Sequence, residues 1–118
     1  MHTSYTSYLL LRTAHSLYGK SPASLAPDEY EKVGRLAERQ QELESRVLRS
    51  EEARDVVVPE AVLQAALQEI RSRYASELEF VDDLAGHGLT VQQFADALER
   101  ELKVEAVLDK IGSRAVPV

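Results

Sequence analysis

Residues 90–111, TVQQFADALERELKVEAVLDKI, contain the pattern that decides the fold class of this 118-residue chain. Thr90 and Gln93 have capping-box spacing, in which two side chains satisfy free backbone N–H groups at the start of a helix. Beyond this start, apolar residues recur at steps of three and four, as one helical face requires: Val91, Phe94, Leu98 and Leu102, followed by Val107, Leu108 and Ile111. We predict a helix over these residues that ends at Gly112.

The same periodicity predicts four more helices earlier in the chain. They cover about 5–18, 27–53 and 59–74, with a shorter helix opened by a second capping-box pattern at Ser76 and Glu79. Pro27 and Pro59 suit first helical turns, and glycines suit the ends, namely Gly19 for the first helix and Gly86 or Gly88 for the fourth. Residues 20–25 read as a loop and 113–118 as an extended tail.

No alternation of period two lasts more than a few residues, so we assign no strand. The chain is long enough to bury a core without disulfides or a structural metal. We therefore predict an all-α fold of about five helices in a single domain, residues 1–118. Within it, the second helix has an apolar stripe: Tyr30, Val33, Leu36, Leu43 and Val47. Gln40 falls within this face, where a polar residue either sets the register against a neighbouring helix or, as we favour, lies at the edge of the stripe.

The charge pattern excludes several classes of partner. The net charge is −6, and Lys and Arg are scattered among Asp and Glu. An acidic chain without a basic cluster is repelled by nucleic acid and by anionic membranes, and it lacks a basic recognition helix. Residues 1–7 contain no Lys or Arg, and no apolar run approaches a membrane span. We expect no nucleic-acid or membrane partner, and a cytoplasmic location unless an export signal has been removed.

Residues that could carry chemistry do not form a recognisable motif. The chain has no cysteine, and none of its histidines, His2, His15 and His87, shows the H-E-x-x-H spacing of a zinc site. Gly86-His87-Gly88 lacks the preceding strand and third glycine of a dinucleotide loop, so it reads as a turn between helices. Asp82-Asp83 reads as helix-surface charge. We predict no catalytic residue, no metal and no cofactor in this chain.

Several short segments carry a resemblance to a known family. The helix order, with the Val58-Pro59-Glu60 entry and the Gly88-Leu89-Thr90 turn, resembles the N-terminal domain of SurA-like chaperones. Closer likeness to the NifM-type isomerases of nitrogen fixation covers nearly the whole chain. The segments that carry it are Tyr8-Leu9-Leu10, Ala14-His15, Arg39-Gln40, Val47-Leu48-Arg49-Ser50, Ser72-Arg73-Tyr74 and Arg100 to Asp109, of which the last is the most specific.

The resemblance implies a folding factor whose client polypeptide is the nitrogenase iron protein. It also implies a parvulin-type peptidyl-prolyl isomerase domain after residue 118, which this sequence does not contain, so no catalytic residue is carried over and this chain is not expected to be an enzyme. A helical adaptor or regulator that binds one fixed protein partner is an alternative, because the same amphipathic helices would serve it.

A client-binding helical domain needs apolar surface that its own helices leave open. The broad apolar faces of the helices at 59–74 and 90–111 are the candidates for this groove. The same faces would also allow two copies of the chain to form a homodimer, for instance by exchanging a helix. The candidate residues are Leu63, Leu67, Ile70, Tyr74, Phe94, Leu98, Leu102 and Leu108.

Overall fold

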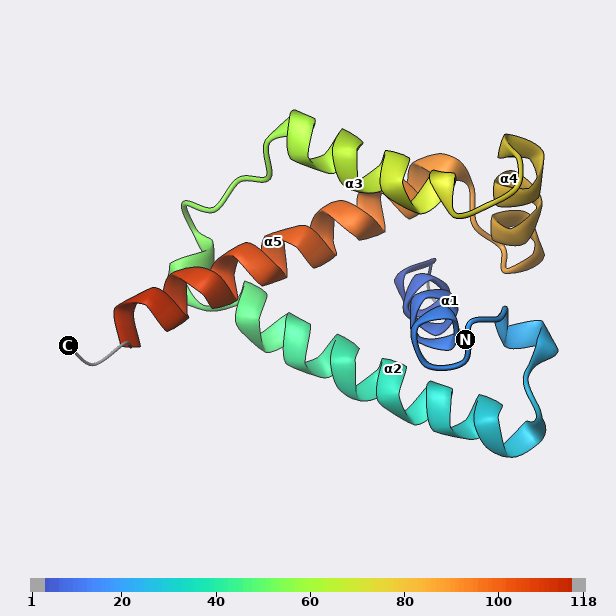
Figure 1. Ribbon diagram of the computed structural model, residues 1–118. Coiled ribbons are helices and arrows are strands. Elements are labelled where there is room, and N and C mark those ends of the chain that lie inside the picture. The colour runs from blue at the N-terminus through green and yellow to red at the C-terminus, as the bar shows by residue number, and fades with distance from the viewer. Residues whose placement is uncertain (1–3, 116–118) are drawn as a thin grey trace.

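The computed structural model describes the backbone of residues 4–115 and the side chains of residues 4–112. This part of the chain holds five α-helices and two short 3-10 helices and contains no strand, which confirms the all-α prediction (Figure 1). The elements are α1 (Ser4–Tyr18), η1 (Pro22–Ser24), α2 (Pro27–Leu48), η2 (Glu51–Ala53), α3 (Glu60–Ser72), α4 (Glu77–Gly86) and α5 (Val91–Ala115).

The last helix, α5, is the element on which the others pack. It contacts α1, α2, α3, α4 and η2. In Figure 1, α3 runs along one side of α5 and α2 diverges from the other side, while α1 is seen nearly along its axis. Because α1 packs on both α2 and α5, it closes one end of the wedge between these two long helices.

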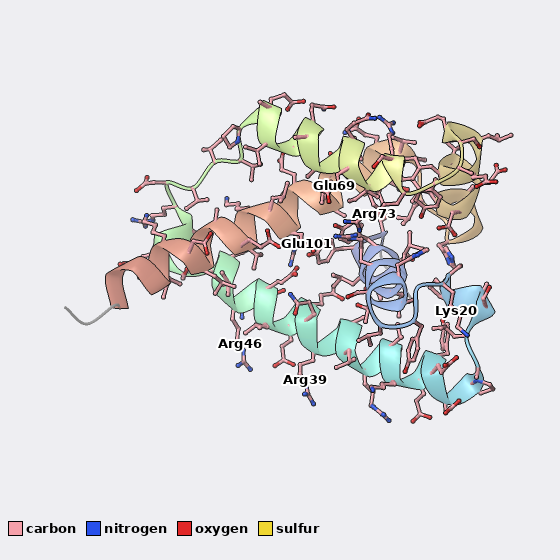
Figure 2. All side chains as sticks on the ribbon, in the orientation of Figure 1. Lys20, Arg39, Arg46, Glu69, Arg73 and Glu101 are labelled. Carbon is pink, nitrogen blue, oxygen red and sulfur yellow. The ribbon has the colours of Figure 1, made fainter. Side chains whose placement is uncertain are left out.

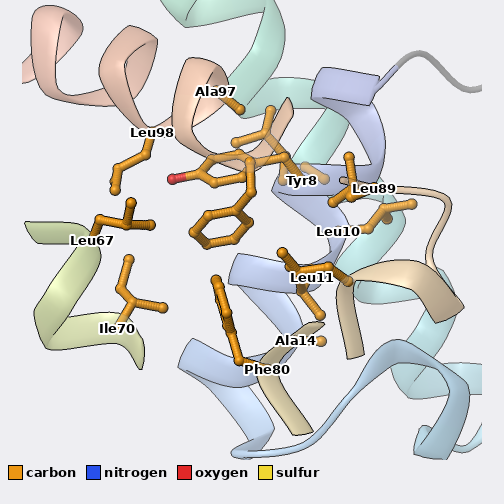
Figure 3. Close-up of a cluster of buried hydrophobic side chains, with 14 of the residues drawn as sticks. Tyr8, Leu10, Leu11, Ala14, Leu67, Ile70, Phe80, Leu89, Ala97 and Leu98 are labelled. Carbon is orange, nitrogen blue, oxygen red and sulfur yellow. The ribbon is translucent and has the colours of Figure 1, made fainter. Parts of the chain in front are cut away.

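The main core forms where α1, α3, α4 and α5 meet (Figure 3). Its centre is aromatic, since Tyr8, Phe80 and Phe94 are almost fully buried. The Phe94 ring meets the Tyr8 and Phe80 rings edge to face, with centroid distances of 5.0 and 5.5 Å. Such pairs stabilise a core beyond the area that they bury. Aliphatic side chains surround them, among others Leu11, Ala14, Leu67, Ile70, Leu84 and Leu98.

A second, smaller apolar cluster joins the end of α2 to the later part of α5. Its buried members are Val47, Ala53, Val104 and Val107. Ala53 comes from η2, which turns the chain back toward α5 after α2 has ended. This cluster fixes the point from which α2 and α5 diverge.

The two predicted capping boxes, at the starts of α5 and α4, are confirmed by side-chain hydrogen bonds found there. At the start of α5, Thr90 N donates to Gln93 Oε1 at 3.0 Å, and Gln93 N donates to Thr90 Oγ1 at 3.1 Å. At α4, Glu79 N donates to Ser76 Oγ at 3.2 Å. Gly19 and Gly88, which follow α1 and α4, have φ of 65° and 74°, a conformation that favours glycine.

Two predicted helix ends are wrong. Gly112 does not end α5, which continues to Ala115, because a glycine with ordinary helical dihedrals is tolerated inside a helix at about 1 kcal/mol. The predicted extended tail is therefore wrong for 113–115, and 116–118 lie outside the described residues. The helix predicted to reach Ala53 ends at Leu48, where Ser50 Oγ donates to Val47 O at 2.6 Å and competes with helical bonding.

The apolar stripe predicted for α2 is rotated relative to the buried face. The residues that α2 buries are Val33, Ala37, Glu44 and Val47. Tyr30 and Leu43, predicted to face the core, are 45% and 49% exposed. Small and polar residues occupy part of this face because α1 packs closely against α2. The rotation leaves leucines of α2 at the edge of the wedge.

Candidate polypeptide-binding cleft

The residues predicted to form a groove mostly face the core. Leu63, Leu67 and Ile70 of α3 are buried, as are Phe94 and Leu98 of α5. Tyr74 and Leu102 are half-buried and pack against the same core, whereas Leu108 is 44% exposed. The two faces thus cover each other and leave no open groove between them. Binding of a client or of a second copy at these residues stays a prediction.

An open cleft of about 500 Å³ lies instead in the wedge beside α1. Its lining comes from α1, α2, the first residue after α3 and one residue of α5. The lining residues are Leu9, Arg12, Thr13, His15, Ser16 and Leu17, then Leu36, Arg39, Gln40, Leu43 and Glu44, and finally Arg73 and Glu101. Six of these, Leu9, His15, Arg39, Gln40, Arg73 and Glu101, belong to the segments that carry the family resemblance.

The apolar part of the cleft is accessible to solvent. Leu17 is 47% exposed and Leu43 is 49% exposed, with Leu36 half-buried between the helices. Leu36 and Leu43 are seven residues apart and so lie on the same face of α2. Large apolar side chains gathered in a hollow and left open to water are characteristic of an interaction surface.

The inner end of the cleft is formed by a fully buried carboxylate. Glu44 has no exposed surface. Its Oε1 accepts a hydrogen bond from Tyr5 OH, and its Oε2 accepts one from Gln40 Nε2 at 2.8 Å. A buried charge needs such partners, because without them desolvation strongly disfavours it. Burial, together with the hydrogen bond to Glu44, raises the pKa of Tyr5 well above its ordinary value of 10.

A second tyrosine and carboxylate pair repeats this arrangement between α1 and α5. Tyr8 OH donates to Glu101 Oε2, and Arg12 Nε lies 3.8 Å from the same oxygen. Burial, and then the negative charge of Glu101, raise the pKa of Tyr8 above its ordinary value. The guanidinium of Arg100 lies 4.4 Å from the centroid of the Tyr5 ring. We name Tyr5, Tyr8, Arg12, Gln40, Glu44, Arg100 and Glu101 the polar seam.

The outer rim of the cleft carries two exposed arginines. Arg39 lies on α2, and no hydrogen bond or ion pair within the described residues involves it. Arg73 lies directly after α3 and pairs with Glu69 at 3.0 Å, four residues earlier. Both members of that pair are more than 60% exposed. Exposed pairs of this kind contribute little, so Arg73 can exchange its partner at small cost.

A further polar cluster joins α4 to α1 and reaches the cleft through His15. Asp83 Oδ2 accepts a hydrogen bond from Tyr74 OH at 2.6 Å and lies 3.3 Å from His15 Nε2. Asp83 Oδ1 lies 3.7 Å from His87 Nε2, which is also 2.8 Å from Ser21 Oγ. His87 thus meets serine and aspartate through one nitrogen, whereas a catalytic triad uses both. The cluster holds α4 in place.

The structure corrects the prediction that the histidines are isolated and that Asp83 is a helix-surface charge. His15 and His87 reach one carboxylate although they are far apart in sequence, and Asp83 is not a plain surface charge. The spacing of four between Asp83 and His87 was the signal that could have indicated this contact. Within residues 4–112 no group of three or more potential ligands could hold a metal ion, and His2 lies outside the described residues. None of the described helices has the length and apolar character to cross a membrane.

The fold and the cleft define an all-helical protein with an open, partly apolar cleft. The chain is 39% identical over 102 residues to a protein of Azotobacter vinelandii named "Putative peptidyl-prolyl cis-trans isomerase NifM". It is 36% identical over 104 residues to the protein of the same name from Azotobacter chroococcum mcd 1. The chain is therefore NifM-like in sequence over most of its length, which confirms the resemblance.

The matches cover 86% and 88% of this chain but only 35% and 36% of the two relatives. The chain thus spans about a third of the length of the curated relatives that it matches. No family model matches the chain. No solved structure gives a significant match.

Proposed function

We propose that this chain is the client-binding helical domain of a NifM-type peptidyl-prolyl cis-trans isomerase, and that its client is the nitrogenase iron protein during folding. The isomerase activity of the whole protein is part of this proposal. Similarity to the two Azotobacter proteins supports the family part. The observation that carries the client-binding part is the cleft, where Leu17 and Leu43 are about half exposed beside polar side chains.

The cleft suits an unfolded client for a physical reason. Unfolded polypeptides expose apolar side chains and unpaired backbone groups, and a hollow with leucine walls and a polar end can meet both. The leucines lie on α1 and α2, which pack against each other and against α5. A surface carried by packed helices needs little ordering on binding, which reduces the entropic cost of association.

An aggregation assay tests this proposal. Unfolded nitrogenase iron protein is diluted into buffer with increasing amounts of the chain, and light scattering is followed. We expect suppression at a few-fold molar excess. The absence of suppression at several-fold excess contradicts the client-binding role.

Two matched leucine variants locate the binding surface. Leu43→Ser removes an apolar side chain from the cleft, whereas Leu108→Ser removes an equally exposed leucine from α5. We expect only the first to weaken suppression, because only Leu43 lines the cleft. If Leu108→Ser alone removes suppression, the client binds along α5 instead. Circular dichroism confirms that both variants fold.

A further inference from the structure

We infer that the cleft selects client segments that combine leucine-type side chains with carboxylates, so that an acidic, apolar polypeptide segment is its preferred occupant. This inference rests on the proposed client-binding function and adds a charge preference to it. The apolar side chains of the segment pack on Leu17, Leu36 and Leu43, and its carboxylates meet the arginines of the rim, Arg39 and Arg73.

The charge of the cleft is opposite to that of the chain. The chain has a net charge of −6, yet the lining contains three arginines, Arg12, Arg39 and Arg73, against two glutamates, Glu44 and Glu101. A positive region within an acidic surface favours binding of negative groups and disfavours positive ones.

The two glutamates of the lining are already engaged. Glu44 accepts hydrogen bonds from Tyr5 and Gln40, and Glu101 accepts from Tyr8 and lies beside Arg12. Both oxygens of Glu44 and Oε2 of Glu101 therefore already have partners within the protein. The charged groups of the lining that remain accessible to a client are therefore the two rim arginines, Arg39 and Arg73, of which Arg73 has an exposed pair with Glu69.

The rim arginines are available to a partner. Arg39 extends from α2 and makes no ion pair within residues 4–112. Arg73 shares only the exposed contact with Glu69 (Figure 2). Arginine suits this role because its planar guanidinium binds a carboxylate through two parallel hydrogen bonds.

The lining also favours a polypeptide over a nucleic acid. It contains four leucines and no Tyr, Phe or Trp on which a base could stack. Proteins that bind single strands combine stacking aromatic side chains with a continuous basic groove.

Three labelled peptides of equal length test the preference by fluorescence anisotropy with the full chain. The first peptide contains leucines among glutamates, at spacings that suit both a helix and an extended chain. The second replaces every glutamate by lysine, and the third replaces every leucine by serine. We expect the leucine and glutamate peptide to bind about tenfold more tightly than either of the others, and to weaken as salt is added. Equal binding of the glutamate and lysine peptides overturns the inference.

Charge reversal in the protein provides the matched test. The double variant Arg39→Glu, Arg73→Glu is expected to lose about tenfold in affinity for the leucine and glutamate peptide and to prefer the lysine peptide. The control is Arg35→Glu, Arg46→Glu, which reverses two exposed arginines of α2 that do not line the cleft (Figure 2 labels Arg46). An equal loss in this control shows a general charge effect and contradicts a preference located in the cleft.

The aggregation assay separates this inference from the proposed function. If the unchanged chain protects the iron protein but binds the glutamate and lysine peptides equally, and Arg39→Glu, Arg73→Glu changes neither result, the charge preference is wrong and the client-binding role stands. If the unchanged chain does not protect the iron protein but binds the leucine and glutamate peptide selectively, the proposed function fails and the preference stands. If sedimentation shows a dimer that Leu43→Ser dissociates, and no peptide binds, a second copy occupies the cleft and the inference is overturned.

Discussion

The two sides of α1 are held by different chemistry. Toward α3, α4 and the start of α5, its side chains enter the apolar core around Phe80 and Phe94. Toward α2 and the middle of α5, they enter the polar seam, where tyrosine hydroxyls meet Glu44 and Glu101. Apolar packing contributes free energy without strict geometry, whereas hydrogen bonds to a buried carboxylate fix how a helix is rotated. The seam therefore sets the orientation of α1, and with it the cleft.

A substitution in the apolar core should cause the largest single loss of stability. Phe94→Ala is expected to lower the free energy of unfolding by about 3–5 kcal/mol, because the ring is almost fully buried against two other rings. Urea denaturation followed by circular dichroism measures the loss. Should the alanine variant not fold, Phe94→Leu is expected to lose about 1.5 kcal/mol. A loss below about 1 kcal/mol for Phe94→Ala would contradict the packing described.

A substitution in the polar seam is expected to cause a smaller loss of stability, and its size should depend on whether the hydrogen-bond partner is replaced as well. Glu44→Ala leaves the Tyr5 hydroxyl and the Gln40 amide without their acceptor and should cost about 1–3 kcal/mol. Adding Tyr5→Phe should recover part of this loss, because it removes the hydroxyl that had lost its acceptor. Glu42→Ala on the same helix breaks only an exposed pair with Arg46 and should cost under about 1 kcal/mol. Equal losses for Glu42 and Glu44 would refute a buried seam.

Alkaline pH should lower stability through the tyrosine hydroxyls of the polar seam. The pKa values of Tyr5 and Tyr8 are raised in the folded protein, whereas tyrosines of the unfolded chain ionise near pH 10. The unfolded state therefore releases these protons first, so stability is complete below pH 10 and falls above it. Each tyrosine contributes a slope of up to about 1.4 kcal/mol per pH unit.

Denaturation midpoints recorded at intervals across this range measure the slope. Tyr8→Phe should reduce the slope above pH 10 while its difference from the unchanged chain stays constant at lower pH. An identical slope in the variant and the unchanged chain would show that the Tyr8 hydroxyl is not held in the seam.

The smallest predicted effect is a gain in stability from a substitution on α5, next to the polar seam. Burial, and then the negative charges of Glu101 and Asp109 one turn away on either side, raise the pKa of Glu105. Because the folded pKa is raised, ionisation lowers stability as pH rises through the ordinary glutamate range. Glu105→Gln should stabilise the chain by about 0.5 kcal/mol at neutral pH. Thermal unfolding at neutral pH and at pH 3 measures the gain and its expected disappearance in acid.

Glu99→Gln is the control for this small gain. Glu99 precedes Lys103 by four residues, a favourable spacing on a helix. Its replacement should give no gain at neutral pH. Similar gains in both variants would indicate a general effect of net charge and not relief of local repulsion.

The helices could be predicted from the sequence because their signals are local. Thr90 with Gln93, Ser76 with Glu79 and the left-handed Gly19 each act within one turn of the helix that they start or end. Gly112 misled because a glycine ends a helix where it adopts the left-handed conformation, as Gly19 does, whereas Gly112 keeps helical dihedrals. Local patterns do not contain that information.

The cleft could not be predicted in the same way. A stripe of apolar residues indicates one buried face, so Leu43 was assigned to the core and Glu44 was not considered for it. The neighbouring position is the buried one, because Tyr5 and Gln40 supply hydrogen bonds that remove the cost of burying the Glu44 carboxylate. These partners come from two helices. Only their arrangement in space shows which side of α2 faces inward.

The position of α5 in the chain order has a consequence for biosynthesis. Tyr8 and its partner Glu101 are 93 residues apart, and α5 contacts all four of the earlier α-helices. On a ribosome, α1 to α4 therefore emerge with their apolar faces uncovered, since the helix that covers them is translated after them. Contacts this distant in sequence also form slowly. The nascent chain therefore exposes apolar surface that favours aggregation. Binding by other cellular factors would protect it until α5 has been translated.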